Sequence, residues 1–164
     1  MSKKIHLLRH AHSVDRQPGQ DDKDRFLSPT GIDEAKLIGS YLDDQQIVLD
    51  SVITSSAVRA NATALLVMEE KKGNENLIIT DTLYESTTRA YLECITSIHD
   101  NAQTVLLVGH NPLITYLAEY LTKNTIGDIV TCGLVTINFE IDSWKEVSEG
   151  NGILLSYVYP AMLR

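Results

Sequence analysis

The chain has 164 residues, a formal net charge of −8 and a pI of about 5.0. A chain of this length is enough for one domain with its own hydrophobic core, and we expect residues 1–164 to form a single domain. Nucleic acids and anionic lipid surfaces bind basic protein surfaces, so neither partner is expected for so acidic a chain.

The two cysteines, Cys94 and Cys132, are far apart and do not form a CxxC motif. This spacing predicts no disulfide framework and no metal site, and two free thiols are typical of a reducing compartment. No apolar run approaches the ~18 residues of a membrane helix, and the first residues (MSKK) do not lead into a signal peptide. We therefore expect a cytoplasmic protein with no membrane association, metal or cofactor.

Apolar runs of strand length alternate with stretches of helical periodicity. In chain order, the sequence predicts a strand at 5–8, a polar loop at 15–23, a helix at 31–44, a strand at 51–54, a helix at 57–70, a strand at 77–79, a helix at 87–99, a strand at 104–108, a helix opening at Asn111–Pro112, and strands at 134–141 and 153–158. Asn111 is the expected N-cap of the helix that opens at Asn111–Pro112. The 57–70 helix is expected to end with Lys71-Lys72-Gly73, a basic last turn followed by a glycine.

This alternation predicts an α/β fold, a three-layer α/β/α arrangement with a mainly parallel sheet. Open sheets of this kind bind ligands beyond the carboxyl ends of their strands. Three predicted strands are followed at once by polar residues: the first by Arg9 and His10, the second by Ser55 and then Arg59, and the central one by His110. We expect these side chains to converge at one edge of the sheet.

Two histidines and two arginines beyond strand ends would form a cationic pocket, and burying so much like charge is costly unless an anion compensates it. Phosphate is the natural anion, because the arginine fork matches its oxygens. A histidine that is unprotonated near neutral pH can accept a phosphoryl group covalently, while arginines neutralise the phosphoryl oxygens. The residues therefore favour phosphoryl-transfer chemistry.

Five segments in order resemble motifs of the histidine phosphatase superfamily, also called phosphoglycerate mutase-like. The resemblance extends from about Ile5 to Asn138. The segments are LRHA at 8–11, LSPTG at 27–31, SSAVRA at 55–60 with Thr63 following, LYE at 83–85 and VGHNP at 108–112.

The resemblance implies a phosphoglycerate mutase-like fold and a metal-independent histidine phosphatase. His10 is similar to the nucleophile that becomes phosphorylated, and Arg9, Arg59 and His110 match the residues that complete the phosphate pocket. Glu85 stands where many members keep the general acid or base. Ser13 and Asn111 are expected as further phosphate or substrate contacts.

Two departures from the general pattern point to the short, SixA-like phosphohistidine phosphatase branch. Ala11 replaces the common glycine, and no large insertion caps the pocket. The resemblance therefore implies protein dephosphorylation in signal transduction, with a phosphorylated protein, for example a histidine phosphotransfer domain, as partner. A small-molecule phosphomonoesterase acting on a small phosphorylated molecule is the alternative, and a non-catalytic phosphate-binding scaffold is a lesser one.

Other polar residues lie near these motifs. The carboxylates of Asp21, Asp22 and Asp24 in the polar loop are interpreted as solvated. Arg25, in the same loop, is placed at the rim of the pocket, and Tyr84 at its mouth. Arg89 is interpreted as a surface residue of its helix.

Overall fold

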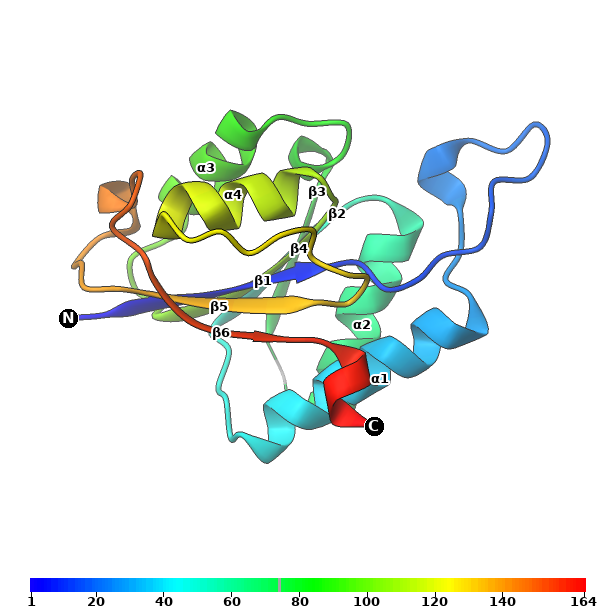
Figure 1. Ribbon diagram of the computed structural model, residues 1–164, viewed down its shortest axis with the longest axis horizontal. Helices are drawn as coiled ribbons and strands as arrows, with labels where there is room; N and C mark the ends of the chain where they lie inside the picture. Colours follow the sequence, from blue (N-terminus) through cyan, green and yellow to red (C-terminus); the bar gives the residue numbers. More distant parts are fainter. Residues whose placement is uncertain (74) are drawn as a thin grey trace.

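The computed structural model describes residues 1–73 and 75–164, which form one six-stranded sheet with helices on either side (Figure 1). In sheet order the strands are β3-β2-β4-β1-β5-β6; the first four are mutually parallel, β5 runs antiparallel to β1, and β6 runs antiparallel to β5. The elements in chain order are β1 (Lys3–Arg9), α1 (Pro29–Asp44), β2 (Ser51–Ser55), α2 (Val58–Lys71), β3 (Asn76–Thr80), α3 (Thr88–Thr96), β4 (Thr104–Gly109), α4 (Leu113–Thr122), β5 (Leu134–Phe139) and β6 (Ile153–Val158).

The side chains of the central strands alternate between two hydrophobic cores. Leu7 and its β4 partner Leu107 pack with α3 and α4 on one face of the sheet. Leu8 and its partner Val108 pack with α1 and α2 on the other face. The three-layer α/β/α arrangement and the mainly parallel sheet predicted from the sequence are thus confirmed. Of the described residues, no helix is both long and apolar enough to cross a bilayer.

The helix after β4 begins later than predicted. Pro112, not Asn111, flanks the first residue of α4, and Pro112 carries no side-chain cap. The Asn111 side chain instead lies alongside the first turn, where its Oδ1 accepts a hydrogen bond of 2.9 Å from the Thr115 hydroxyl. The prediction of Asn111 as N-cap was therefore wrong, although its amide still bonds the beginning of α4.

Other element ends also differ from the predicted ones, and three of them have a clear physical reason. The helix predicted to reach residue 99 ends at Thr96, where the Ser97 hydroxyl donates to a carbonyl of the last turn. Strand β5 ends at Phe139, because its partner there, Lys3, is the first residue of β1. After α2, Lys72 rather than the predicted glycine takes the left-handed conformation, with φ of 60°.

The chain that follows β1 packs against the start of α1. Ser28 caps this helix, and its hydroxyl accepts a hydrogen bond of 3.0 Å from the Gly31 amide. A β-carbon at Gly31 would lie 2.0 Å from the His12 carbonyl oxygen, so only glycine allows this contact. The glycine of the 27–31 segment therefore fixes α1 against the chain that leaves β1 with His10.

Candidate active site

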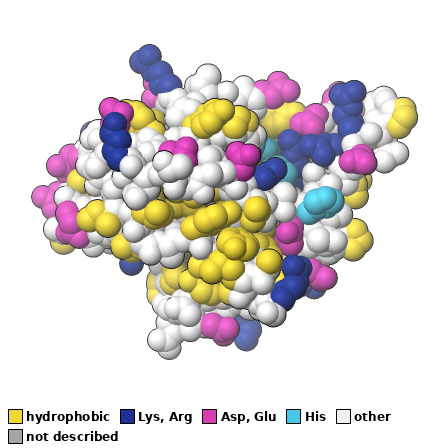
Figure 2. Space-filling model, in the orientation of Figure 1, with side chains coloured by type: hydrophobic (Ala, Val, Ile, Leu, Met, Phe, Trp, Pro, Cys, Tyr) yellow, Lys and Arg dark blue, Asp and Glu magenta, His cyan; other side chains and the backbone are white. Residues whose placement is uncertain are grey.

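Strands β1, β2 and β4 end at one edge of the sheet, as predicted, and a pocket of about 660 Å³ lies beyond them. Figure 2 shows basic and histidine side chains gathered there, between the body of the molecule and the projecting segment that Figure 1 draws in blue. All seven residues singled out from the sequence line this one pocket: Arg9, His10, Ser13, Arg59, Glu85, His110 and Asn111. A larger hollow, of about 820 Å³ between β3 and α3, contains none of them.

His10 is buried at the floor of the pocket, with a relative exposure of 8%. Its Nδ1 lies 2.8 Å from the Ala11 carbonyl oxygen, which can only accept, so Nδ1 carries the proton and Nε2 carries the lone pair. Burial lowers the pKa of His10 to about 3; the bond to Ala11 opposes this shift, and the charge of His110 and the neighbouring arginines strengthens it. His10 is therefore a neutral imidazole whose Nε2 is available as a nucleophile.

Arg59, near the start of α2, directs its guanidinium at this nitrogen. Its Nε donates to His10 Nε2 at 3.3 Å. Its two terminal nitrogens bond Asp22: Nη1 donates to the Asp22 carbonyl oxygen at 2.8 Å and Nη2 to the carboxylate at 3.0 Å. The pairing of Asp22 with Arg59 contradicts the interpretation of that carboxylate as merely solvated.

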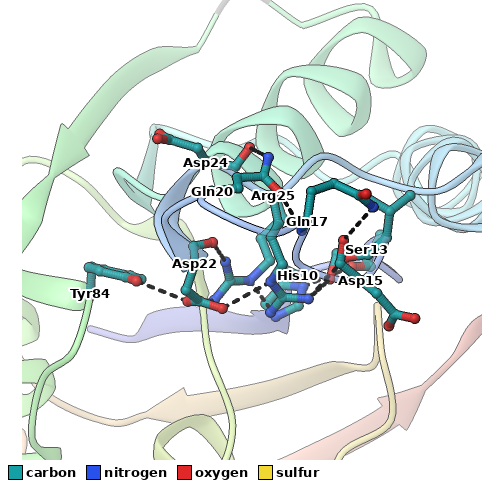
Figure 3. Close-up of polar contacts among 12 residues, drawn as sticks. His10, Ser13, Asp15, Gln17, Gln20, Asp22, Asp24, Arg25 and Tyr84 are labelled. Atoms are coloured by element: carbon teal, nitrogen blue, oxygen red, sulfur yellow. Dashed lines mark hydrogen bonds and ion pairs between the residues drawn. The ribbon is translucent and has the colours of Figure 1, made fainter.

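The loop that carries Asp22 contributes to the lining of the pocket and lies beside His10 (Figure 3). The Arg25 guanidinium donates to the Asp22 carboxylate at 2.9 Å and to the Ser13 hydroxyl at 3.0 Å. The Tyr84 hydroxyl donates to the same carboxylate at 2.9 Å. Arg25 and Tyr84, which were expected at the edge of the pocket, both line it.

The second histidine, His110, follows β4 and faces the first. The ring centroids of His10 and His110 are 5.2 Å apart. His110 Nε2 lies 2.8 Å from the hydroxyl of Ser55, the last residue of β2, and the Tyr84 ring packs edge-on against His110 at 5.7 Å. Burial and the charge of Arg59 lower the pKa of His110 to about 4, so this imidazole is also neutral at physiological pH.

Arg9 and Asn111 meet at one backbone atom. Arg9 Nη1 and Asn111 Nδ2 both donate to the Ile129 carbonyl oxygen, at 2.8 and 2.9 Å. Burial lowers the pKa of Arg9, while the nearby Asp128 opposes that shift. The segment before β5 therefore holds both side chains at the pocket wall.

Glu85 lines the pocket but is exposed, with a left-handed backbone φ of 47°. Arg89 lies outside the pocket; its Nε bonds Glu93 one turn further along α3, and its side chain is 87% exposed. The interpretation of Arg89 as a surface residue is thus confirmed. His12 also lines the pocket, where its Nδ1 lies 2.7 Å from the Ser28 hydroxyl.

The geometry combines a neutral nucleophile with fixed cations. A phosphoryl group brought to His10 Nε2 would meet the Nε side of Arg59 and lie near the ring of His110, whose centroid is 5.2 Å from that of His10. Arginine donors of this kind stabilise the charge that develops on phosphoryl oxygens. A model of the histidine phosphatase superfamily (branch 1) matches residues 5–91, more than half of the chain.

The chain belongs to the histidine phosphatase superfamily. It is similar to an uncharacterised protein of Mycobacterium tuberculosis (28% identical over 162 residues; 93% of this chain and 99% of that one). It is also similar to the phosphohistidine phosphatase SixA of Escherichia coli (24% identical over 169 residues; 98% and 96%).

Solved structures of this superfamily share the fold. A SixA-type protein of Agrobacterium tumefaciens superimposes with a TM-score of 0.84 at 25% identity, covering 96% of this chain and 98% of that one. A phosphoglycerate mutase of Bacillus anthracis superimposes with a TM-score of 0.67 at 18% identity, covering 94% and 92%. The fold is therefore phosphoglycerate mutase-like, as predicted, and the chain is a phosphatase of this superfamily.

Proposed function

We propose that this phosphatase removes phosphate from phosphohistidine on a protein, through a covalent phosphohistidine formed on His10. The observation that carries the proposal is the orientation of His10, whose proton is held on Nδ1 by Ala11 and whose Nε2 faces the Arg59 guanidinium. The similarity to the SixA phosphohistidine phosphatase supports the substrate class.

In the first step, the bond from phosphorus to His10 Nε2 forms as the P–N bond of the substrate breaks. Before the P–N bond breaks, the free ring nitrogen of the phosphorylated imidazole takes up a proton from solvent, so the substrate ring departs as a neutral imidazole. Water then cleaves the bond to Nε2 and releases inorganic phosphate. Arg9, Arg59 and His110 hold the phosphoryl oxygens, with Ser13 and Asn111 as further contacts, and none of these steps requires a metal ion or a cofactor.

The proposed partner is a phosphorylated protein such as a histidine phosphotransfer domain, which places the enzyme in signal transduction. We extend the proposal to residues 1–164 as one domain acting in the cytoplasm. Both cysteines are free, which supports a reducing compartment.

A small-molecule phosphomonoesterase is the second candidate. Glu85 lines the pocket, and an alkoxide leaving group needs a general acid more than an imidazole does. A carboxyl group there would suit a phosphate ester.

The deciding experiment is a parallel time course with a phosphohistidine-bearing phosphotransfer domain and a panel of phosphorylated metabolites, both with chelator present. We expect fast loss of label from the protein and slow turnover of the metabolites, and the reverse would favour the second candidate. His10→Ala should abolish both turnover and the acid-labile, alkali-stable phosphoenzyme. A phosphoenzyme that persists in His10→Ala would refute His10 as the nucleophile.

A further inference from the structure

The arrangement of donors on Arg59 assigns different tasks to its two edges. The outer edge, formed by the two Nη atoms, is bound by Asp22 through both its carbonyl oxygen and its carboxylate. The side edge, which includes Nε, faces His10. A guanidinium can bind a phosphoryl group through its side edge while its outer edge stays occupied, because each Nη carries two protons.

Asp22 is itself held by two further groups. One carboxylate oxygen accepts from Arg25 Nε at 2.9 Å, and the oxygen that accepts from Arg59 also accepts from the Tyr84 hydroxyl. Partial burial alone would raise the pKa of Asp22, but the hydrogen bond from Tyr84 and the interaction with Arg59 outweigh it and lower the pKa to about 2. The carboxylate is therefore ionised throughout the physiological range.

The same network reaches the second histidine. Tyr84, which donates to Asp22, packs its ring edge-on against His110. Asp22 thus connects the guanidinium beside His10 to the side chain that packs on His110, although none of its hydrogen bonds goes to an imidazole. Figure 3 shows Asp22 between Tyr84 on one side and the His10 region on the other.

We propose that Asp22 is a positioning residue of this phosphatase: it holds the outer edge of Arg59 so that the Nε edge stays aimed at the phosphoryl group on His10. This inference rests on the proposed role of His10 as nucleophile. Asp22 remains bound to Arg59 during turnover. The opposite possibility is that the carboxylate is a stand-in for phosphate and has to leave before substrate binds, and the two make opposite predictions for a charge-neutral variant.

The test compares Asp22→Asn with Asp21→Asn, a matched control that removes the same charge from the same loop. Asp21 is exposed and makes no side-chain cap bond. We expect Asp22→Asn to lower kcat for an aryl phosphate by about 10²-fold, the loss typical of a slightly misplaced catalytic group, and to weaken inhibition by vanadate. Asp21→Asn should leave both unchanged.

A spectroscopic readout separates positioning from a general loss of structure. The Arg59 Nε–H signal in 15N-resolved NMR spectra should be present in the wild type and in Asp21→Asn, and broadened or lost in Asp22→Asn. Both variants should still unfold in one cooperative transition, although Asp22→Asn should melt at a lower temperature than Asp21→Asn, because it loses the ion pairs with Arg59 and Arg25. If Asp22→Asn fails to fold, Asp22→Ser provides a second variant with the same expected loss of kcat.

Three outcomes would overturn the proposal: a kcat of Asp22→Asn equal to that of Asp21→Asn, an unchanged Arg59 signal, or tighter vanadate binding with kcat preserved. The last would identify the carboxylate as a competitor of phosphate. Labelling of wild-type His10 by substrate phosphate distinguishes these failures from a failure of the proposed function. If the wild type is never labelled on His10, the nucleophile is wrong; if it is labelled and Asp22→Asn is labelled at the same rate, only the role of Asp22 is wrong.

Discussion

Three histidines with lowered pKa values, two of them buried and one half-buried, make the stability of this protein sensitive to mild acid. Burial lowers the pKa of His6 to about 4, with the charge of Lys4 adding to the shift, and the pKa values of His10 and His110 are about 3 and 4. In the unfolded chain each histidine titrates near 6.5, so below that pH the unfolded state binds more protons and the folded state loses stability as pH falls. Between pH 7.5 and pH 5 each histidine contributes a loss of about 2 kcal/mol, or about 6 kcal/mol together.

A loss of that size approaches the whole stability of many domains. We expect urea denaturation at a series of pH values to show the free energy of unfolding falling steeply between pH 7.5 and 5. Asp22 does not obscure this window, because its lowered pKa stabilises the fold above pH 4 and that contribution is lost only in stronger acid. A free energy of unfolding that stays flat, or rises, from pH 7.5 to 5 would refute the reasoning.

Single substitutions show how much each histidine contributes to the pH dependence of stability. His6 lies outside the pocket, and its Nδ1 bonds Thr136 at 2.8 Å, a contact that an asparagine amide can imitate. His6→Asn should therefore reduce the pH dependence by about a third, or about 2 kcal/mol over this range. His99→Asn, at an exposed position, is the matched control and should leave the slope unchanged.

Two further substitutions test how the pocket is held. Ser55→Ala removes the hydroxyl that lies 2.8 Å from His110 Nε2. We expect kcat to fall about tenfold, which corresponds to the loss of one hydrogen bond of about 1.4 kcal/mol. The control Ser56→Ala should leave kcat unchanged, and equal rates for the two variants would contradict the role of Ser55. Gly109→Ala would place a β-carbon 2.6 Å from the Tyr91 hydroxyl. Chemical denaturation should show the free energy of unfolding reduced by about 1–3 kcal/mol. A variant as stable as the parent would show that the strand end can shift to make room.

The sequence predicted the layers well because the signal for them is local. The uninterrupted apolar run of β4 is typical of a central parallel strand, and β4 lies between β1 and β2 as such a run requires. Element ends were less predictable, because tertiary partners set them. Strand β5 stops where β1 no longer provides a neighbour, and neither the sequence of β5 nor its periodicity contains that information.

The site residues were predictable for a related reason. Parallel strands bring their carboxyl ends to one edge, so residues just beyond β1, β2 and β4 meet regardless of how far apart they are in sequence. Asp22 was misjudged because no such rule governs it. It lies in a loop between elements, and its bond to Arg59 spans 37 residues, so its neighbours in sequence indicated only a solvated cluster.

The ion pairs of Asp22 also change the charge balance of the phosphate pocket. A pocket of uncompensated arginines was expected to require an external anion, yet the Asp22 carboxylate already neutralises part of the charge of Arg59 and Arg25. Charge balance alone therefore does not select phosphate in this pocket. Phosphate is selected by the orientation of the hydrogen-bond donors. The donors that Asp22 leaves free face the unprotonated Nε2 of His10. A tetrahedral phosphoryl group bound there can accept their hydrogen bonds, whereas the planar carboxylate of the loop does not reach that position. An anion that cannot reach Nε2 would bind only weakly in this pocket. Asp22→Asn, which frees the outer edge of Arg59, should therefore lower kcat and should not increase the affinity for phosphate.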